Sequence, residues 1–199
     1  MNLHIHALCA LRLEDFLRFF DDVAFSDNPE WAGCYCVYNH FSGTDDAWMQ
    51  RNAADNREEA ICMIEQGSLT GFLAYDGDAP IGWCNAGDKA SYTRFSRLLT
   101  AEDQGIRICA ATCFITAPAY RRMGIAQSLL RYACEALALK GYDMMEAYPT
   151  MANGSCAMHY HGHPSMLMTA GFSLYQSFDG CVCMQKLLGK GHEYEPDSL

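Results

Sequence analysis

The chain has 199 residues and a formal net charge of -10, with 50% hydrophobic and 19% charged residue types. This length fits one folded domain, and the apolar content excludes a disordered chain. We expect a single domain over residues 1–188 and a frayed tail over residues 189–199. The negative charge repels phosphate backbones and no block of Lys or Arg offsets it, which argues against nucleic acid as a partner.

The ends and the cysteines bear on where the protein resides. The first residues, MNLHIHALCA, lack a basic stretch ahead of an apolar run, and no apolar run reaches the roughly 18 residues that cross a membrane. The 11 cysteines are an odd number in a chain too long to need a disulfide framework. We therefore expect a cytoplasmic protein with no membrane partner.

The first half of the chain mixes strands and helices. Residues 4–10 are strand-like, and apolar positions at helical spacing from Leu13 to Phe20 predict a helix. The segment WAGCYCVYNHF is aromatic and β-prone, and residues 45–66 have a helical pattern. The runs GFLAY and PIGWCNA, joined by Asp76-Gly77-Asp78, predict an antiparallel hairpin.

The second half alternates between the two kinds of element. A helix-like stretch over 92–99 precedes a buried strand over 106–116, and an apolar stripe from Ile125 to Leu137 predicts a helix that ends at Lys140-Gly141. A strand over 144–148, a polar loop over 150–162, a short helix over 165–170 and a final strand or hairpin over 172–187 follow. This order indicates a mixed α/β or α+β domain.

The stretch Arg121-Arg122-Met123-Gly124-Ile125-Ala126 lies between the predicted strand and helix, where chemistry is expected. The first amides of a helix lack intrahelical partners, so a turn at that position can bind a pyrophosphate through backbone N-H groups. Small residues at Gly124 and Ala126 let phosphates approach the backbone. The stretch matches neither a Walker A loop nor a dinucleotide-binding fingerprint.

With its neighbours, this stretch resembles the acetyl-CoA loop of GNAT acetyltransferases, whose pattern is Gln/Arg-x-x-Gly-x-Gly/Ala. Pro118-Ala119-Tyr120 precedes it, and Ala170-Gly171-Phe172 resembles the family's late Gly-Phe element. The segments WAGCYCVYNH, LAYDGDAPIGW and MEAYPT are similar to a bacterial subgroup of that family whose substrate is unassigned. The implied fold is a twisted, mostly antiparallel sheet flanked by helices, with strands splayed around the cofactor.

The resemblance also implies a cofactor and the residues that bind it. Acetyl-CoA would be held through its pyrophosphate by the turn, and its pantetheine arm would pair with the backbone of the preceding strand. The implied cofactor-binding residues are Phe114, Thr116, Arg121, Arg122, Met123, Gly124, Ile125 and Ala126. The implied activity is N-acyl transfer from acetyl-CoA to a primary amine of a small molecule or peptide, by direct attack in a ternary complex.

Two positions depart from the family pattern. Many relatives have a tyrosine acid four residues before the Gly-Phe pair, where this chain has Leu167, and some have a glutamate base near the position of Ala110. We expect Leu167→Tyr to preserve activity. Our candidate catalytic residues are Glu146, which could deprotonate an ammonium, and Tyr148 at the end of the same strand; a structural carboxylate is the alternative for Glu146.

Substrate contacts and competing functions remain open. We expect Trp83, Tyr92 and His163 near the acceptor, although aromatic side chains are more often core residues. The net charge favours a cationic acceptor, and we expect a monomer or homodimer. The alternatives are a CoA-binding regulatory module without turnover and a metal or redox protein. The metal alternative would use residues of His159-Tyr160-His161-Gly162-His163, Cys34-x-Cys36 and Cys181-x-Cys183.

Overall fold

Seven strands form one sheet in the order β1-β2-β3-β4-β5-β7-β6. The structure is a computed structural model that describes residues 1–96, 105–150, 159–178 and 181–189. The strands are β1 (Leu3–Ala7), β2 (Gly71–Asp76), β3 (Ala79–Asp88), β4 (Ile108–Thr116), β5 (Met144–Ala147), β6 (Ser173–Phe178) and β7 (Cys181–Leu187). The helices are α1 (Leu13–Arg18), α2 (Asp45–Met49), α3 (Ala53–Glu65), α4 (Thr93–Ser96), α5 (Ile125–Leu139) and α6 (Pro164–Thr169).

The sheet is mostly antiparallel, which confirms the predicted fold class. Only β4 and β5 pair in parallel, through the crossover helix α5. The predicted hairpin is β2-β3, with Gly77 at a φ of 58° in its turn, and the predicted ending at β6-β7 is also a hairpin. In the described part of the chain, no helix has the length and apolarity needed to cross a membrane.

Strands β4 and β5 separate partway along their length. The two pair only over Ile108–Ala111 of β4 and Met144–Ala147 of β5, whereas β4 continues to Thr116. On its other side, β4 has a bulge against β3, where Asn85 faces Cys113 and Ala86 faces Ala111, so Thr112 has no opposite residue. The second half of β4 is therefore open to other parts of the molecule along the edge that β5 leaves.

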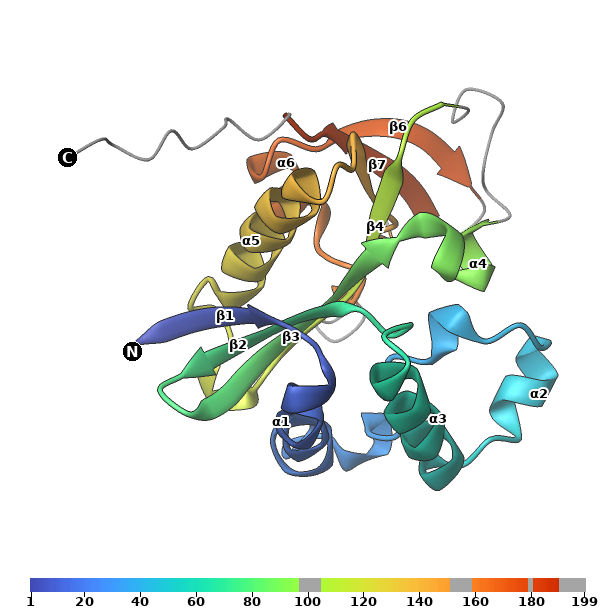
Figure 1. The fold of residues 1–199 in the computed structure, drawn as a ribbon, viewed down its shortest axis with the longest axis vertical. Coiled ribbons are helices and arrows are strands. Elements are labelled where there is room, and N and C mark those ends of the chain that lie inside the picture. Colours follow the sequence, from blue (N-terminus) through green and yellow to red (C-terminus); the bar gives the residue numbers. More distant parts are fainter. Residues whose placement is uncertain (97–104, 151–158, 179–180, 190–199) are drawn as a thin grey trace.

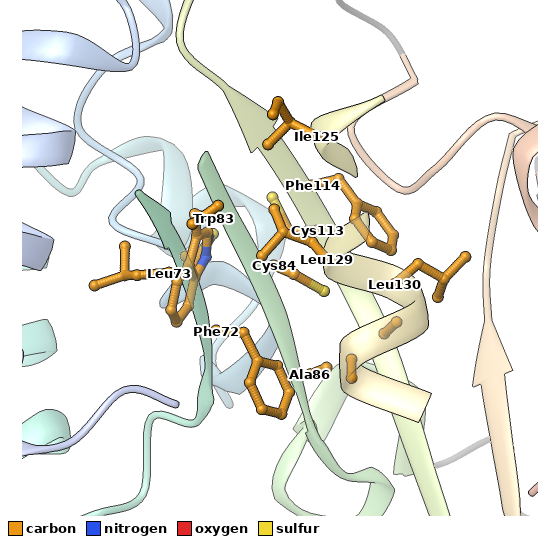
Figure 2. Close-up of a cluster of buried hydrophobic side chains, with 14 of the residues drawn as sticks. Phe72, Leu73, Trp83, Cys84, Ala86, Cys113, Phe114, Ile125, Leu129 and Leu130 are labelled. Atoms are coloured by element: carbon orange, nitrogen blue, oxygen red, sulfur yellow. Dashed lines mark hydrogen bonds between the residues drawn. The ribbon is translucent and has the colours of Figure 1, made fainter. Parts of the chain in front are cut away.

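Helices cover the two faces of the sheet, with α5 on one face and α1 on the other (Figure 1). Trp83 of β3 points toward α1, where its ring lies 5.1 Å from that of Phe16. The preceding residue, Gly82, lies under α5, and a Cβ there would come within 2.8 Å of Ile125. Figure 2 shows Ile125 and Leu129 of α5 over the strands. This close packing fixes the start of α5 next to the end of β4.

Some predicted elements differ from the structure. The WAGCYCVYNHF segment forms no strand: it folds into turns, with φ of 44° at Tyr35 and 54° at Cys36, followed by a 3-10 helix over Tyr38–His40. These turns deliver Cys36 to the core, where its Sγ accepts a hydrogen bond from Trp83 Nε1. The predicted helix over 45–66 is two helices, because Asn52 caps α3 by accepting from the amide of Asp55. The first strand ends at Ala7 rather than at residue 10.

Other predictions lie partly outside the described residues. Of the predicted helix over 92–99, only residues 92–96 are described, and the helix there is α4 over Thr93–Ser96. Most of the polar loop over 150–162 and nearly all of the C-terminal tail fall outside the described ranges.

Candidate active site

The turn between β4 and α5 has the backbone conformation of an anion-binding site. Arg122 and Gly124 have φ of 65° and 81°, and Gly124, the N-cap residue of α5, makes no side-chain cap hydrogen bond. The amides at the start of a helix lack intrahelical partners, and the helix dipole adds positive potential there. A turn with alternating left-handed residues also points successive N-H groups inward. The sequence motif therefore has the local structure that phosphate binding requires.

A cleft of about 710 Å³ opens in front of this turn. One wall is the end of β4 with the phosphate turn, another is the segment after α1, and a third is α6 with the residues before it. The lining residues are Ala24, Phe25, Asp27, Asn28, Trp31, Phe114, Ile115, Thr116, Tyr120, Arg121, Arg122, Gly124, Ile125, Ala126, Gln127, His159, Tyr160, Gly162, His163, Ser165, Met166 and Thr169.

The cleft contains all but one of the predicted cofactor-binding residues. Phe114, Thr116, Arg121, Arg122, Gly124, Ile125 and Ala126 line it. Met123 does not line the cleft, and its side chain is 52% exposed. A backbone amide can still face a ligand when its side chain points to solvent, so the exposure of Met123 limits only a role for its side chain.

The open edge of β4 is partly occupied by the chain itself. The amide of Phe114 donates to the carbonyl oxygen of Tyr160 at 2.6 Å, and Nδ1 of His161 lies 2.6 Å from the carbonyl oxygen of Thr112. Gly162 packs against the Phe114 ring, where a Cβ would come within 3.3 Å of a ring carbon. In this conformation, the Phe114 amide is not available to pair with a pantetheine arm, unlike the expectation from sequence.

The histidines of the HYHGH segment have different surroundings. His159 and His163 line the cleft, with ring centroids 4.7 Å apart. The Nδ1 atom of His163 caps α6 by accepting from the Ser165 amide at 3.2 Å, whereas the buried Nδ1 of His159 has no hydrogen-bond partner among the described residues. His161 instead faces β4. The alternation of the segment thus separates His161 from the other two.

Burial of His161 predicts a pH-dependent stability. Burial lowers the pKa of His161 below its usual 6.5, so the unfolded chain binds this proton more readily than the folded one. The contribution of His161 to stability is complete above about pH 6.5 and is lost as the pH falls from there toward the lowered pKa. The pKa of His40 is lowered by burial as well, so His40 adds to the same trend.

We expect the melting temperature of the parent to fall between about pH 7.5 and about pH 5.5, and that of His161→Asn to fall less. Asparagine can still donate to Thr112 from its amide but does not titrate. The matched control is His4→Asn, since His4 is exposed on β1. Thermal denaturation at both pH values measures the effect, and equal slopes for His161→Asn and the control would contradict the prediction.

The candidate catalytic residues Glu146 and Tyr148 lie in a buried polar network. The Glu146 carboxylate lies 2.7 Å from Lys89 Nζ and accepts from Gln185 Nε2 at 2.9 Å, and it also accepts from the Tyr148 hydroxyl. Both partners of the Lys89–Glu146 ion pair are almost completely buried. Ala110 of β4 is opposite Glu146 in the parallel ladder. Its side chain, which lies between Lys89 and Glu146, is only a methyl group.

This network is not part of the cleft lining described above. None of its four side chains contributes to that surface. Its carboxylate already has a cation and two hydrogen-bond donors. Glu146 and Tyr148 therefore remain predicted catalytic residues. The structural alternative is that Glu146 serves only as the buried ion-pair partner of Lys89.

Two of the three predicted substrate residues belong to the core in this structure. Trp83 and Tyr92 are both fully buried, and the Tyr92 hydroxyl donates to Asn85 Oδ1 at 2.8 Å. A side chain without exposed surface cannot contact a substrate, which explains why neither residue lines the cleft. The third, His163, does line it. The aromatic character of Trp83 and Tyr92 fitted either a substrate contact or a core position, and their burial assigns both residues to the core.

Leu167 is also a core residue, and this changes the expectation for its replacement. It lies on α6, is fully buried and belongs to the main apolar cluster. Leu167→Tyr would add a larger ring and a hydroxyl to a packed site, so we now expect a loss of about 1–3 kcal/mol in the free energy of unfolding. Denaturant titration measures this loss. An unchanged midpoint would show that the neighbourhood of α6 can accept the ring.

The described residues do not favour a metal or redox site. Among them, no group of three or more His, Cys, Asp or Glu side chains could hold a metal ion. The cysteines of that part of the chain are free, and burial raises the pKa of the Cys34 thiol to about 12 and that of the Cys36 thiol well above its usual value. Neutral thiols are poor ligands and poor nucleophiles. Cys36 and Cys183 are buried in apolar clusters, where they pack as small apolar residues do.

Sequence reasoning missed the wall of the cleft that follows α1. Asp27 and Asn28 line it, together with Phe25 and Trp31. Asp27 forms a two-pronged ion pair with Arg121, with Nη1–Oδ2 and Nη2–Oδ1 distances of 2.5 and 3.0 Å. These two residues are separated by 94 positions. No local pattern in the sequence signals such a contact.

Comparison with known proteins agrees with this geometry. The acetyltransferase (GNAT) family profile matches residues 30–162. This match covers the hairpin, β4, the phosphate turn, α5 and the residues before α6. The chain belongs to the GNAT family of acetyltransferases. A search of curated proteins found no match.

Several solved structures share the fold. The PaiA N-acetyltransferase of Thermoplasma acidophilum, solved with coenzyme A, is 16% identical with a TM-score of 0.57, and the match covers 94% of this chain and 99% of that one. A GNAT-family acetyltransferase of Listeria monocytogenes is 14% identical with a TM-score of 0.60, covering 94% and 95%. The GNAT domain of S. lividans PAT is 18% identical with a TM-score of 0.58, covering 94% and 90%. At these identities, the likeness concerns the fold.

Proposed function

We propose that this acetyltransferase moves an acetyl group from acetyl-CoA to a primary amine of a small molecule or peptide by direct attack in a ternary complex. The observation that carries the proposal is the start of α5, whose N-cap residue Gly124 makes no side-chain cap hydrogen bond and which opens onto a cleft of about 710 Å³. The proposal assigns the whole chain from residue 1 to 188 to one such domain, resident in the cytoplasm as a monomer or homodimer.

The residues of the turn fit acetyl-CoA. A Cβ at Gly124 would have no atom of the described residues within 4 Å, so the described part of the chain leaves space for a phosphate in front of this residue. The amides from Arg122 to Ala126 would hold the pyrophosphate, and Arg122 itself lines the same cleft. When bound, acetyl-CoA supplies the acetyl group as an activated thioester. The protein's contribution is to position both reactants and to exclude water.

Proton transfer from the acceptor is the step for which a side chain is still needed. An ammonium cannot attack a thioester, so a base or a chain of water molecules must remove a proton. Glu146, with Tyr148 donating to it, remains our candidate for this role. The buried network supports it only if the acceptor amine can reach the carboxylate or a water molecule bonded to it.

A CoA-binding regulatory module without turnover is the second candidate. It is favoured by Leu167 and Ala110 at the positions where relatives have an acid and a base, and by the Phe114 amide, which is already bonded to Tyr160. Release of free CoA in the presence of a panel of amines, polyamines, aminoglycosides and peptides separates the two. Acceptor-dependent release with an acetylated product supports the transferase, and tight CoA binding without release supports the module.

A further inference from the structure

The ion pair between Asp27 and Arg121 joins two walls of the cleft that have different tasks. Arg121 is the first residue of the phosphate turn, whereas Asp27 lies in the segment after α1, which forms another wall of the cleft. Both side chains are 45% exposed. The hydrogen bonds from Arg121 hold the pKa of Asp27 below its usual value, so Asp27 is a carboxylate at neutral pH.

Asp27 has chemistry that no other described residue brings to the cleft. Among the described cleft-lining residues, it is the only one with a carboxylate. Its neighbours on the same wall include Phe25 and Trp31, and the Trp31 side chain is 40% exposed although large and apolar. A carboxylate beside an exposed aromatic surface suits a cation attached to an apolar group.

The ion pair conflicts with phosphate binding at the turn. A guanidinium binds phosphate as well as carboxylate, and the phosphates of CoA carry more negative charge than one aspartate. A phosphate at the turn therefore attracts Arg121 away from Asp27, and the Asp27 carboxylate repels the same phosphate. Occupation of the turn leaves an unpaired carboxylate facing the cleft.

We propose that Asp27 binds the ammonium group of the acceptor, and that CoA makes it available by taking Arg121. The acceptor is then a primary amine on an aromatic or aliphatic group, without a carboxylate beside the amine, because Asp27 would repel that carboxylate. The inference rests on the proposed function and specifies its acceptor class. Asp27 binds the substrate in this scheme and takes no part in proton removal.

Because coupling between two ligands is reciprocal, CoA raises the affinity for the amine by the same factor as the amine raises the affinity for CoA. The factor is limited by the strength of the exposed ion pair, and we expect about two- to fivefold. Asp27→Asn removes both the repulsion of phosphate and the ammonium site. We therefore expect this variant to bind CoA at least as tightly as the parent, and to lose the coupling.

Equilibrium binding of CoA and of 2-phenylethylamine, each alone and in the presence of the other, tests the site. In the presence of CoA, Asp27→Asn should weaken the amine about tenfold or more, the scale of a lost hydrogen bond to a charged group. The matched control is Asp46→Asn, which makes the same charge change at an exposed position on α2. An amine affinity equal to that of the control overturns the proposal. Weaker CoA binding by Asp27→Asn also overturns the proposal, because the ion pair would then stabilise the turn in the conformation that binds CoA.

Selectivity gives a second readout. Phenylalanine differs from 2-phenylethylamine only by the carboxylate beside the amine. In the presence of CoA, the parent should bind 2-phenylethylamine about tenfold or more tightly than phenylalanine. Asp27→Asn should reduce this preference. A parent that binds neither amine, or prefers phenylalanine, overturns the proposal. If the parent binds 2-phenylethylamine with CoA but transfers no acetyl group from acetyl-CoA, the proposed function fails while the ammonium site stands.

Discussion

Replacing Gly124 with valine is expected to abolish the thermal stabilisation that acetyl-CoA gives to the parent protein. Gly124 has a φ of 81°, a left-handed conformation that a β-branched residue strongly disfavours. The Cβ of valine would also enter the open space in front of the turn, where a phosphate would approach the backbone. Both effects act on the amides proposed to hold the pyrophosphate.

The measurement is a melting curve with and without acetyl-CoA. A ligand that binds only the folded state at about 100 times its Kd stabilises that state by about 2.7 kcal/mol, which is the shift that the variant should lose. The backbone strain itself costs about 1–3 kcal/mol, so the variant without ligand should melt lower but stay folded. No atom of the structure's described segments lies within 4 Å of the added Cβ, so no clash with the described core is expected.

Gly67→Val is the matched control for this strain. Gly67 has a φ of 71°, has equally open surroundings and lies just after α3, away from the cleft lining. The control should lose comparable stability and keep the full response to acetyl-CoA. If Gly124→Val responds to acetyl-CoA as the control does, the pyrophosphate does not bind at this turn.

The features that sequence predicted well are those fixed by neighbours in the chain. The turn Asp76-Gly77-Asp78 and the exit of α5 at Gly141 depend on residues that accept positive φ, and both occur as predicted. The phosphate turn belongs to the same class, because the end of a strand, a glycine and the start of a helix are all local. Its position in the cleft then follows from the packing of α5 on Gly82.

The features that sequence did not predict depend on distant contacts. The WAGCYCVYNHF segment has β-prone residues, but Trp83 and Asn85 both donate to Cys36 and hold it in irregular turns. Tertiary contacts override an intrinsic preference in such cases. Asp27 reaches Arg121 only because the segment after α1 folds back over the end of β4.

The Lys89–Glu146 ion pair has one partner whose position was predicted from the sequence and one that depends on a distant contact. The sequence placed Glu146 beside the motif strand, and the pairing of β4 with β5 confirms that position. Lys89 follows β3, on the far side of β4, and reaches the carboxylate across Ala110. The side chain that decides whether Glu146 is a base or a structural carboxylate could therefore be found only in the folded molecule.

Glu146→Gln is expected to lower both stability and turnover. The variant leaves the Lys89 ammonium buried without its counter-charge, and removal of one partner from a buried pair typically costs about 3–5 kcal/mol. For a chain of this size, that is a fall in melting temperature on the order of 10 °C. If Glu146 is the base, turnover should also fall by about 10²-fold or more, with nearly unchanged acetyl-CoA affinity.

The double variant Lys89→Met with Glu146→Gln separates the two effects. Without the buried ammonium, the remaining amide can still accept from Tyr148 and pair with Gln185, and replacement of a whole buried ion pair is often neutral for stability. We expect the double variant to recover most of the lost melting temperature. The control Glu135→Gln removes an exposed carboxylate of α5 and should change neither property.

The turnover of this stabilised double variant decides the role of Glu146. Stability near that of the parent combined with turnover still about 10²-fold low assigns proton removal to the carboxylate, because folding is then no longer limiting. Turnover that returns to the parental value at neutral pH with the same acceptor would instead make Lys89–Glu146 a structural pair beneath β4, and solvent in the cleft would then take the proton.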